Sequence, residues 1–341
     1  VAVRPKLKKQ IEELYRKHPE EARDSFGEDP FEVKNILKYW VFSEKPEFHV
    51  IPTDTINIHI DKDALLRSGI MLPKTIRHLK EEDLKDAIPD KLYISLTDIR
   101  MLTKVDLLML EMLANCNWER PLYLAISVGS VSKLKFDNYF VQEGLAFRFT
   151  PFDYKKWGDV GENRLYAVDV ERLYDNVMNR YKYGGLDTPG LYLDETTLRT
   201  CWYHRRLFAQ LAKELIAQGD NERAKKVLAY AEQVIPGYNV PETHESGSYD
   251  IATAYAALGE KTKAVTLAVH LIAEAEDYIN WAFSLKGNRI EMVRNDCIYK
   301  FWQWNQYNEL LKKIDGEKYK ESNRRFEEKY ALFAPTMNYK N

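Results

Sequence analysis

The chain has 341 residues, of which 45% are apolar and 30% are charged. Its 7 Trp, 22 Tyr and 14 Phe supply ample apolar surface for a core, which excludes the disordered, collagenous and low-complexity classes of protein. Fifty Lys and Arg face 52 Asp and Glu, and the resulting net charge of −2 argues against nucleic acid as a partner, because nucleic acid selects a basic domain or stripe. At about 150 residues per domain, this length predicts two or three domains.

Neither a membrane helix nor a disulfide framework is predicted. No apolar run approaches the ~18 residues that a membrane-spanning helix needs, and no signal-peptide pattern opens the chain. The chain starts at Val1 rather than at Met, so we expect it to be an excised piece of a longer protein. Cys116, Cys201 and Cys297 are widely separated and form no C-x-x-C motif, and we interpret them as small buried residues.

Residues 1–45 are predicted to form an amphipathic helical lead-in. Leu7, Ile11 and Leu14 fall at helical spacing within a basic segment, 4–17, and an acidic run follows it through residue 32. We interpret both charge runs as the solvated surface of this lead-in rather than as binding sites.

Residues 46–193 are predicted to form an α/β domain. Short runs of β-branched and aromatic residues, bounded by turn residues, indicate strands, and Thr103 marks the start of a helix. A strand, a helix and a strand joined by short connections favour a parallel βαβ unit. The expected strands are 48–51, 55–60, 92–96, 122–126 and 145–152, and the expected helices are 103–113, 136–144 and 169–181.

Residues 195–341 are predicted to form an all-α, tetratricopeptide-like helical-repeat domain. Segments 211–236 and 251–276 superpose with a shift of 40 residues, which aligns Gly219 with Gly259. Each glycine is expected to end one helix of a hairpin in a left-handed turn, and the small residues around it allow close helix packing. Residues 237–247 are an insertion between the repeats, and the chain beyond residue 287 is expected to supply capping helices.

No motif for phosphate binding, nucleophilic catalysis or metal binding is present. The sequence has no G-x-G-x-x-G, G-K-[ST], G-x-S-x-G or H-E-x-x-H pattern. His59 and Asp61 share a strand face, but Asp61 or Asp63 is better explained as the N-cap of a short helix. His244 is expected on the solvated surface of the insertion. We therefore expect no cofactor, no metal and no catalytic residue in this chain.

The first candidate binding segment precedes the predicted strand 122–126. An indole beside a guanidinium and carboxamides is a common way to hold a sugar ring or a planar anion. The alternative, which we favour, is that Trp118 fills the core while Arg120 pairs with Glu119 or Glu143. The candidate residues of this segment are Asn115, Asn117, Trp118, Glu119, Arg120 and Glu143.

A second polar and aromatic segment covers residues 173–199. Asn176 and Asn179 are three residues apart on one helical face, and a Gly-Gly pair follows them. We interpret this segment as the junction between the two domains. Its candidate residues are Asn176, Asn179, Tyr192, Asp194 and Arg199.

Four segments in this order resemble a known family. The segments are FHVIPTDTINIHIDKDALLRSG, NWERPLYLA, YFVQEGLAFRFTP and LYDNVMNRYKYGG with the following LYLDETTLR. Together with the weak repeats, they resemble the soluble C-terminal region of polytopic bacterial membrane proteins that are similar to protein O-mannosyltransferases. The resemblance covers about residues 35–285.

The resemblance implies a location, partners and a function. The chain would lie on the periplasmic side of the bacterial inner membrane, beside the membrane-helix portion of its own parent, and could meet an exported acceptor protein or a glycan. The acidic catalytic loop of such lipid-linked sugar transferases lies between membrane helices outside this chain, so the chain is expected to be a non-catalytic accessory domain. An alternative is a protein-interaction module that acts through its repeats. A hydrolase built on Glu119 and Glu143 is the least favoured hypothesis, because a sequence shows neither their separation nor their pKa values.

Overall fold

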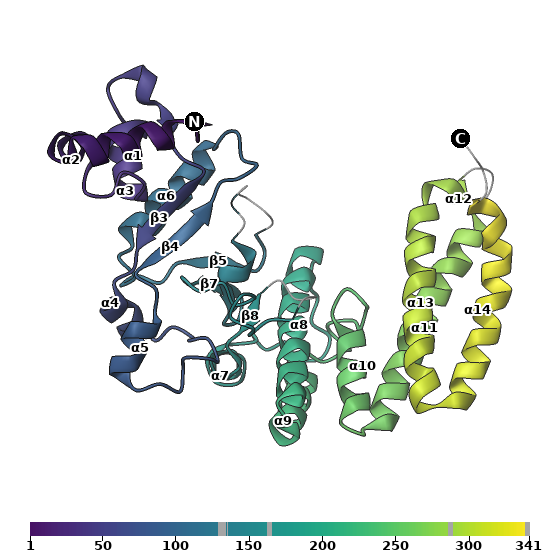
Figure 1. Cartoon of the computed structure of the whole chain (residues 1–341). Helices are drawn as coiled ribbons and strands as arrows, with labels where there is room; N and C mark the ends of the chain where they lie inside the picture. Colours follow the sequence, from purple (N-terminus) through teal and green to yellow (C-terminus); the bar gives the residue numbers. More distant parts are fainter. Residues whose placement is uncertain (129–133, 135, 162–165, 286–288, 338–341) are drawn as a thin grey trace. The chain divides into compact units, whose positions relative to one another are not determined.

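The computed structural model describes residues 1–128, 134, 136–161, 166–285 and 289–337. The chain divides into two compact units, Val1–Asp169 and Val170–Asn341 (Figure 1). The first unit contains small sheets and helices and the second is helical, which confirms the predicted α/β region followed by an all-α region. The division falls earlier than the boundary near residue 193 that the sequence suggested. None of the described helices is both long and apolar enough to span a membrane.

The α/β unit contains short strands joined by helices and long loops. Two of its predicted helix caps are confirmed: Asp61 accepts a hydrogen bond from the Ala64 amide (2.9 Å), and Thr103 forms a reciprocal capping box with Asp106. The strands are β1 (Ala2–Val3), β2 (Val50–Ile51), β3 (Thr55–His59), β4 (Lys91–Ser95), β5 (Tyr123–Ala125), β6 (Phe140–Gln142), β7 (Ala146–Phe149) and β8 (Ala167–Val168). The helices are α1 (Leu7–Lys17), α2 (Pro19–Phe26), α3 (Val33–Ile36), α4 (Lys62–Arg67), α5 (Glu81–Ala87) and α6 (Lys104–Asn115).

These strands form three separate sheets. β1 pairs with β2 in parallel, and β3 pairs with β4 antiparallel from Thr55–Ser95 to His59–Lys91. The third sheet has the order β5-β7-β6-β8, in which only β6 and β8 are parallel. The predicted parallel βαβ unit is therefore wrong, because β4 and β5 lie in different sheets on either side of α6 in the chain.

The predicted helix 136–144 is also wrong. Asp137–Tyr139 form a single 3₁₀ turn, and the chain then enters β6, whose Val141 lies opposite Arg148 of β7. Gly144 has a φ of 153° in the tight connection between these strands. Cross-strand pairing of Phe140 and Val141, which are good strand formers, outweighs the weak helical spacing of the segment.

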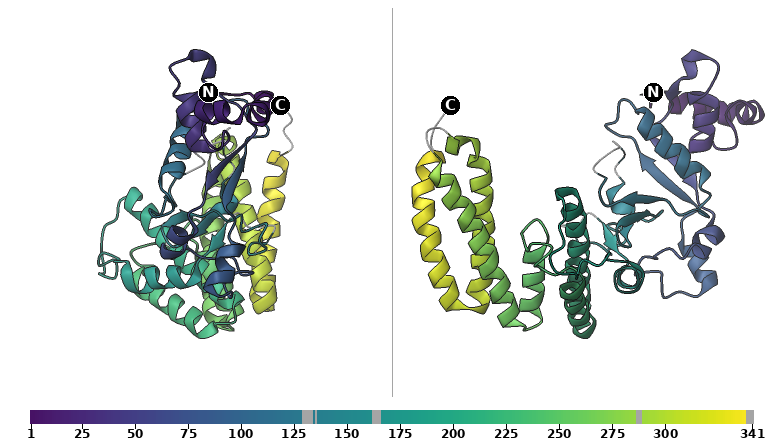
Figure 2. Two further views of the ribbon diagram at one scale, coloured as in Figure 1. Left: turned by 60° about the vertical axis from the view of Figure 1, so that its left-hand side comes forward. Right: turned by 180° about the vertical axis from the view of Figure 1, so that it is seen from behind.

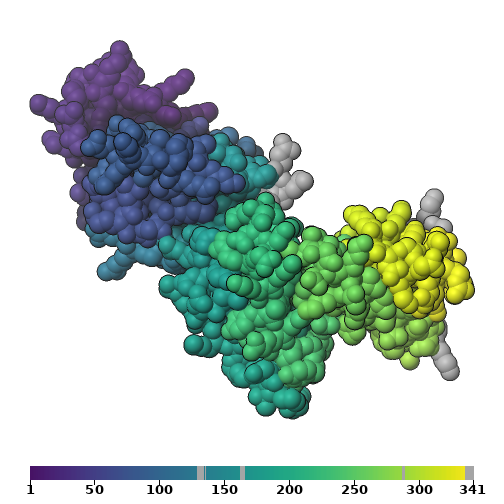
Figure 3. Space-filling model, turned by 90° about the horizontal axis from the view of Figure 1, so that it is seen from below, coloured from purple at the N-terminus to yellow at the C-terminus, as the bar shows by residue number. Residues whose placement is uncertain are grey.

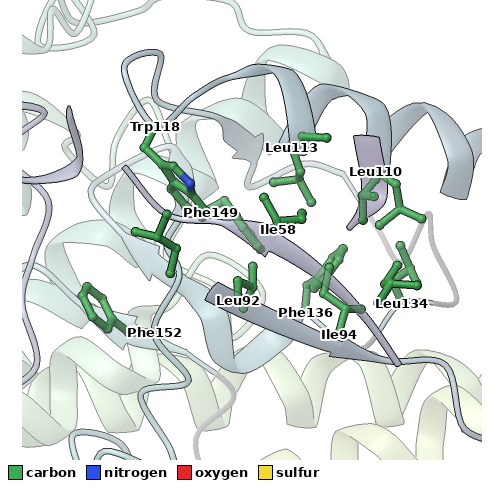
Figure 4. Packing of buried hydrophobic residues seen from close by; sticks show 14 of the residues in the cluster. Ile58, Leu92, Ile94, Leu110, Leu113, Trp118, Leu134, Phe136, Phe149 and Phe152 are labelled. Atoms are coloured by element: carbon green, nitrogen blue, oxygen red, sulfur yellow. The ribbon is translucent and has the colours of Figure 1, made fainter. Parts of the chain in front are cut away.

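The core of the α/β unit lies between α6, the two-stranded β3–β4 sheet and the third sheet. Figure 4 shows Ile58, Leu92 and Ile94 of the β3–β4 sheet beside Leu110 and Leu113 of α6. The lead-in 1–45, purple in Figure 3, is more than a solvated cover. Its residues Val33, Ile36 and Leu37 belong to this core, and Ile11, Trp40 and Val50 form a second, smaller cluster.

Asp29 connects the lead-in to the β3–β4 sheet. Its carboxylate accepts hydrogen bonds from Lys91 Nζ (2.6 Å), Asn57 Nδ2 (3.0 Å) and the Phe31 amide (2.9 Å). Partial burial opposes ionisation of this carboxyl, but the bonds from Lys91, Phe31 and Asn57 prevail and lower its pKa.

The helical unit is a series of packed hairpins. α8 packs against α9 and α10, α11 packs against α10 and α13, and α14 packs against α13. The right-hand view of Figure 2 shows the yellow α14 running alongside α13. The elements are α7 (Val170–Asp175) with a π-helical turn (Asn176–Arg180), α8 (Glu195–Ala217), α9 (Asn221–Val234), α10 (Ser248–Ala257), α11 (Lys261–Ser284), α12 (Arg289–Met292), α13 (Arg294–Ile314) and α14 (Gly316–Met337). Positions 287 and 288 of the expected capping segment lie outside the described residues.

The 40-residue register of the two hairpins recurs in their turns. Gly219 and Gly259 are left-handed, with φ of 80° and 79°. Gly219 donates to the Ile216 carbonyl and Asp220 to Leu215, and the equivalent Gly259 and Glu260 amides donate to Ala256 and Tyr255. The predicted glycine turns are confirmed, while the tetratricopeptide assignment stays a prediction.

Replacing Asp29 with Asn should destabilise the α/β unit in a pH-dependent way. Because its pKa is lowered on folding, the carboxylate adds stability above the unfolded pKa of about 4, and this contribution is lost as the pH falls through the lower folded pKa. We expect Asp29→Asn to lower the melting temperature at neutral pH and to approach the parent protein in acid. The control Asp24→Asn changes an exposed carboxylate of the same lead-in and should have little effect at either pH. An equal effect of Asp29→Asn at both pH values would contradict this role.

Candidate functional site

The turn after α6 places Trp118 inside the α/β unit. Asn117 and Trp118 have φ values of 47° and 61°, so two consecutive non-glycine residues are left-handed. Trp118 is 6% exposed, and its indole stacks on Phe149 of β7 with ring centroids 6.3 Å apart (Figure 4). The indole Nε1 donates a hydrogen bond to the His59 carbonyl at 2.8 Å. The left-handed pair thus turns the chain so that Trp118 connects the β3–β4 sheet to the third sheet.

Among the described residues, Trp118 lines only a small void. The void between Trp118, Arg120, Arg148 and Phe149 measures about 10 Å³, which is hardly room for one water molecule. Of the two interpretations of Trp118, its burial supports the one in which the ring is part of the core.

Glu143 forms an ion pair with Arg148, whereas the sequence suggested Arg120 as its partner. Its carboxylate lies 3.7 Å from Arg148 Nη1 and accepts a hydrogen bond from Tyr123 Oη at 2.8 Å. Arg148 also donates to the Ser68 hydroxyl and to the carbonyls of Ser68 and Gly69. Both members of this ion pair are almost fully buried. The expected pairing of Glu143 with Arg120 is therefore replaced by a core pair with Arg148, which the sequence analysis missed.

The other candidates of this segment lie on the surface. Glu119 and Arg120 are exposed, and within the described residues the Arg120 side chain makes no ion pair. Asn117 accepts a hydrogen bond from Lys34 Nζ (3.1 Å), and Asn115 donates to the Glu111 carbonyl (2.9 Å) at the end of α6. These polar side chains thus lie on the surface, whereas the neighbouring indole is buried.

The candidates between residues 173 and 199 have local roles in the helical unit. Asn179 donates to Asp175 (3.0 Å) within the π-helical turn that also contains Asn176. Asp194 is the N-cap of α8 and accepts bonds from the amides of Thr196 and Thr197, and the bond from the Thr197 hydroxyl is the main cause of its lowered pKa. Tyr192 is 89% exposed, and Arg199 pairs with Glu195 one turn away on α8.

His244 is not the solvated residue that the sequence suggested. Its ring is half-buried, stacks on Tyr249, meets the edge of Trp302, and its Nδ1 lies 2.9 Å from Tyr307 Oη. Burial lowers the pKa of His244. The insertion 237–247 is thereby packed onto α13.

A cavity that the sequence analysis missed opens in the helical unit. It measures about 550 Å³, within the range typical of ligand pockets, and lies between α9, α10, the start of α11 and the insertion. One signal in the sequence pointed there, because an insertion between two packed hairpins must hold them apart or fill the space between them.

The cavity has polar walls. Glu232 of α9 accepts a hydrogen bond from Tyr255 Oη and forms an ion pair with Lys263, whose Nζ lies 2.7 Å from Glu232 Oε2. The buried Arg205 lies at one end, where burial lowers its pKa to about 10. Among the residues that the structure describes, no three His, Cys, Asp or Glu side chains gather closely enough to hold a metal ion.

One comparison with known proteins bears on function. Residues 6–171 match the model of a family described as TMEM260-associated domain 2. TMEM260 is a candidate protein O-mannosyltransferase, so the match relates this segment to a domain that accompanies a glycosyltransferase. No curated protein and no solved structure matches the chain.

Truncation of Trp118 tests its place in the core. We expect Trp118→Ala to reduce the free energy of unfolding by about 3–5 kcal/mol, since it removes a buried ring and leaves a cavity between two sheets. Thermal melting measures the effect, with the exposed neighbour Arg120→Ala as a control that should melt like the parent. An unchanged melting temperature for Trp118→Ala, combined with a loss of ligand binding, would instead assign the indole to recognition.

Proposed function

We propose that this chain is the non-catalytic extracytoplasmic domain of a membrane glycosyltransferase-like protein, where it binds or positions an acceptor protein or glycan. The observation that carries the proposal is the match of residues 6–171 to a domain associated with TMEM260. The proposed location is the periplasmic side of a bacterial inner membrane, with the membrane-helix portion of the parent chain as the immediate partner.

The environment of the two candidate carboxylates supports a role other than glycoside hydrolysis. A glycosidase needs two carboxyl groups that flank a sugar, one of them available as an acid. Glu143 is buried and engaged by Arg148 and Tyr123, whereas Glu119 is exposed. Glu119 and Glu143 therefore do not form the pair of carboxyl groups that hydrolysis of a glycosidic bond requires.

A second candidate function is a protein-interaction module that acts through the helical unit without any link to glycosyl transfer. The 550 Å³ cavity favours it, because this opening lies in the helical unit and outside the residues that match the family model.

Removal of this chain from its parent separates the two functions. We expect the parent lacking residues 1–341 to give markedly lower glycan occupancy on exported proteins than the intact parent, because acceptors are no longer held near the transferase. Mass spectrometry of periplasmic glycopeptides measures occupancy, and immunoblotting of the membrane portion controls for its abundance. Unchanged occupancy at equal abundance would reject the accessory role and leave the interaction module.

A further inference from the structure

The cavity of the helical unit is a cleft with an aliphatic floor. The cleft is lined by Leu228 and Ala231 of α9, by Ile235 directly after α9, by Ile251 of α10 and by Leu267 of α11. These side chains are almost fully buried in the helical unit, so the floor belongs to the packed core. Such a floor accommodates an aliphatic side chain by apolar burial, and the exposed ring of Tyr238 also lines the cleft.

One wall of the cleft presents a row of polar groups. Thr262, Thr266 and His270 are exposed, line the cleft and follow one another at intervals of four residues along α11. Residues at this spacing share one face of a helix. Hydroxyl and imidazole groups in a row can bond to the amides and carbonyls of an extended backbone that runs along α11.

A carboxylate without a direct partner lies at the end of the cleft. Glu242 of the insertion is half-buried, and within the described residues it makes no hydrogen bond or ion pair. The nearby Arg205 attracts it electrostatically but donates its own hydrogen bonds elsewhere, among them to the carbonyls of Ile235 and Val240. Glu232, in contrast, is already paired with Lys263. Glu242 is thus the carboxylate available to a cationic ligand.

We propose that the cleft between α9 and α11 binds an extended polypeptide segment that carries an aliphatic side chain next to a Lys or Arg. The aliphatic side chain packs on the floor, the backbone runs along the polar row of α11, and the cation meets Glu242. The inference rests on the proposed function in one respect, since it identifies the acceptor protein, rather than a glycan, as what this unit holds.

Binding of defined peptides to the purified chain tests the proposal. The probes are four fluorescein-labelled dodecapeptides of Gly and Ser with Leu-Lys, Leu-Glu, Ser-Lys or Ser-Glu at the centre, and fluorescence anisotropy measures their affinity. We expect the Leu-Lys peptide to bind best, with about a fivefold preference over Leu-Glu, as is typical of one partly screened ion pair.

Two variants and one matched control locate the site. Glu242→Gln should abolish the preference for Lys over Glu and keep the preference for Leu over Ser. Thr266→Trp should fill the cleft from its exposed wall and abolish binding without a change in melting temperature. Glu222→Gln, on the first turn of α9 outside the cleft lining, should bind like the parent.

Three outcomes would overturn the proposal. The first is equal or absent binding of all four peptides, and the second is a preference for Lys that persists in Glu242→Gln. The third is binding of glycans on an array, but not of the peptides, if Thr266→Trp abolishes that glycan binding.

The same variant in the full-length parent separates this proposal from the accessory function. If deletion of residues 1–341 lowers glycan occupancy but Thr266→Trp does not, the cleft proposal fails and the accessory function stands. If the peptides bind as expected but deletion leaves occupancy unchanged, the cleft proposal stands and the accessory function fails.

Discussion

The buried guanidinium of Arg205 is the interaction on which the cleft of the helical unit depends. It is 3% exposed and donates hydrogen bonds to the carbonyls of Ile235, Val240 and Pro241 and to the Ser246 hydroxyl. Burial of a charge is costly unless hydrogen bonds replace its hydration. These bonds therefore stabilise Arg205 and, at the same time, give the carbonyls of the insertion their partners. The insertion is held in one conformation as a result, and it closes the end of the cleft with Glu242 on its lining.

In the α/β unit, polar and aromatic side chains that resemble a binding site serve to join sheets. The Trp118 indole, in the turn after α6, stacks on Phe149 of the third sheet and donates to the His59 carbonyl of β3. Arg148 reaches from β7 to the carbonyls that follow α4. Loss of one member of a buried pair such as Arg148–Glu143 leaves the other charge buried without its counter-ion, so these contacts favour one arrangement of the sheets. Trp118, Glu143 and Arg148 thus belong to the core, whereas the polar candidates Asn115, Asn117, Glu119 and Arg120 stay on the surface.

The two lines of evidence for function come from different parts of the chain. The family match covers residues 6–171 and relates the α/β unit to a glycosyltransferase-associated domain. The cleft lies between residues 205 and 270, in the helical unit, beyond that match. A role in which one part belongs with a transferase and the other holds a polypeptide accounts for both observations, and each part can be tested without the other.

Local signals in the sequence determined the glycine turns and the 40-residue register of the helical unit, as well as the helix caps Asp61 and Thr103 of the α/β unit. Helical periodicity and a left-handed glycine depend on residues close in the chain, so a sequence displays them directly. Only the tertiary structure decided that β4 and β5 enter different sheets, that residues 140–142 form a strand, that Glu143 pairs with Arg148, and that a cleft opens beside α11. Each of these depends on which distant segment supplies the neighbour, because a strand takes its partner, and a buried charge its counter-ion, from the packing of the whole unit.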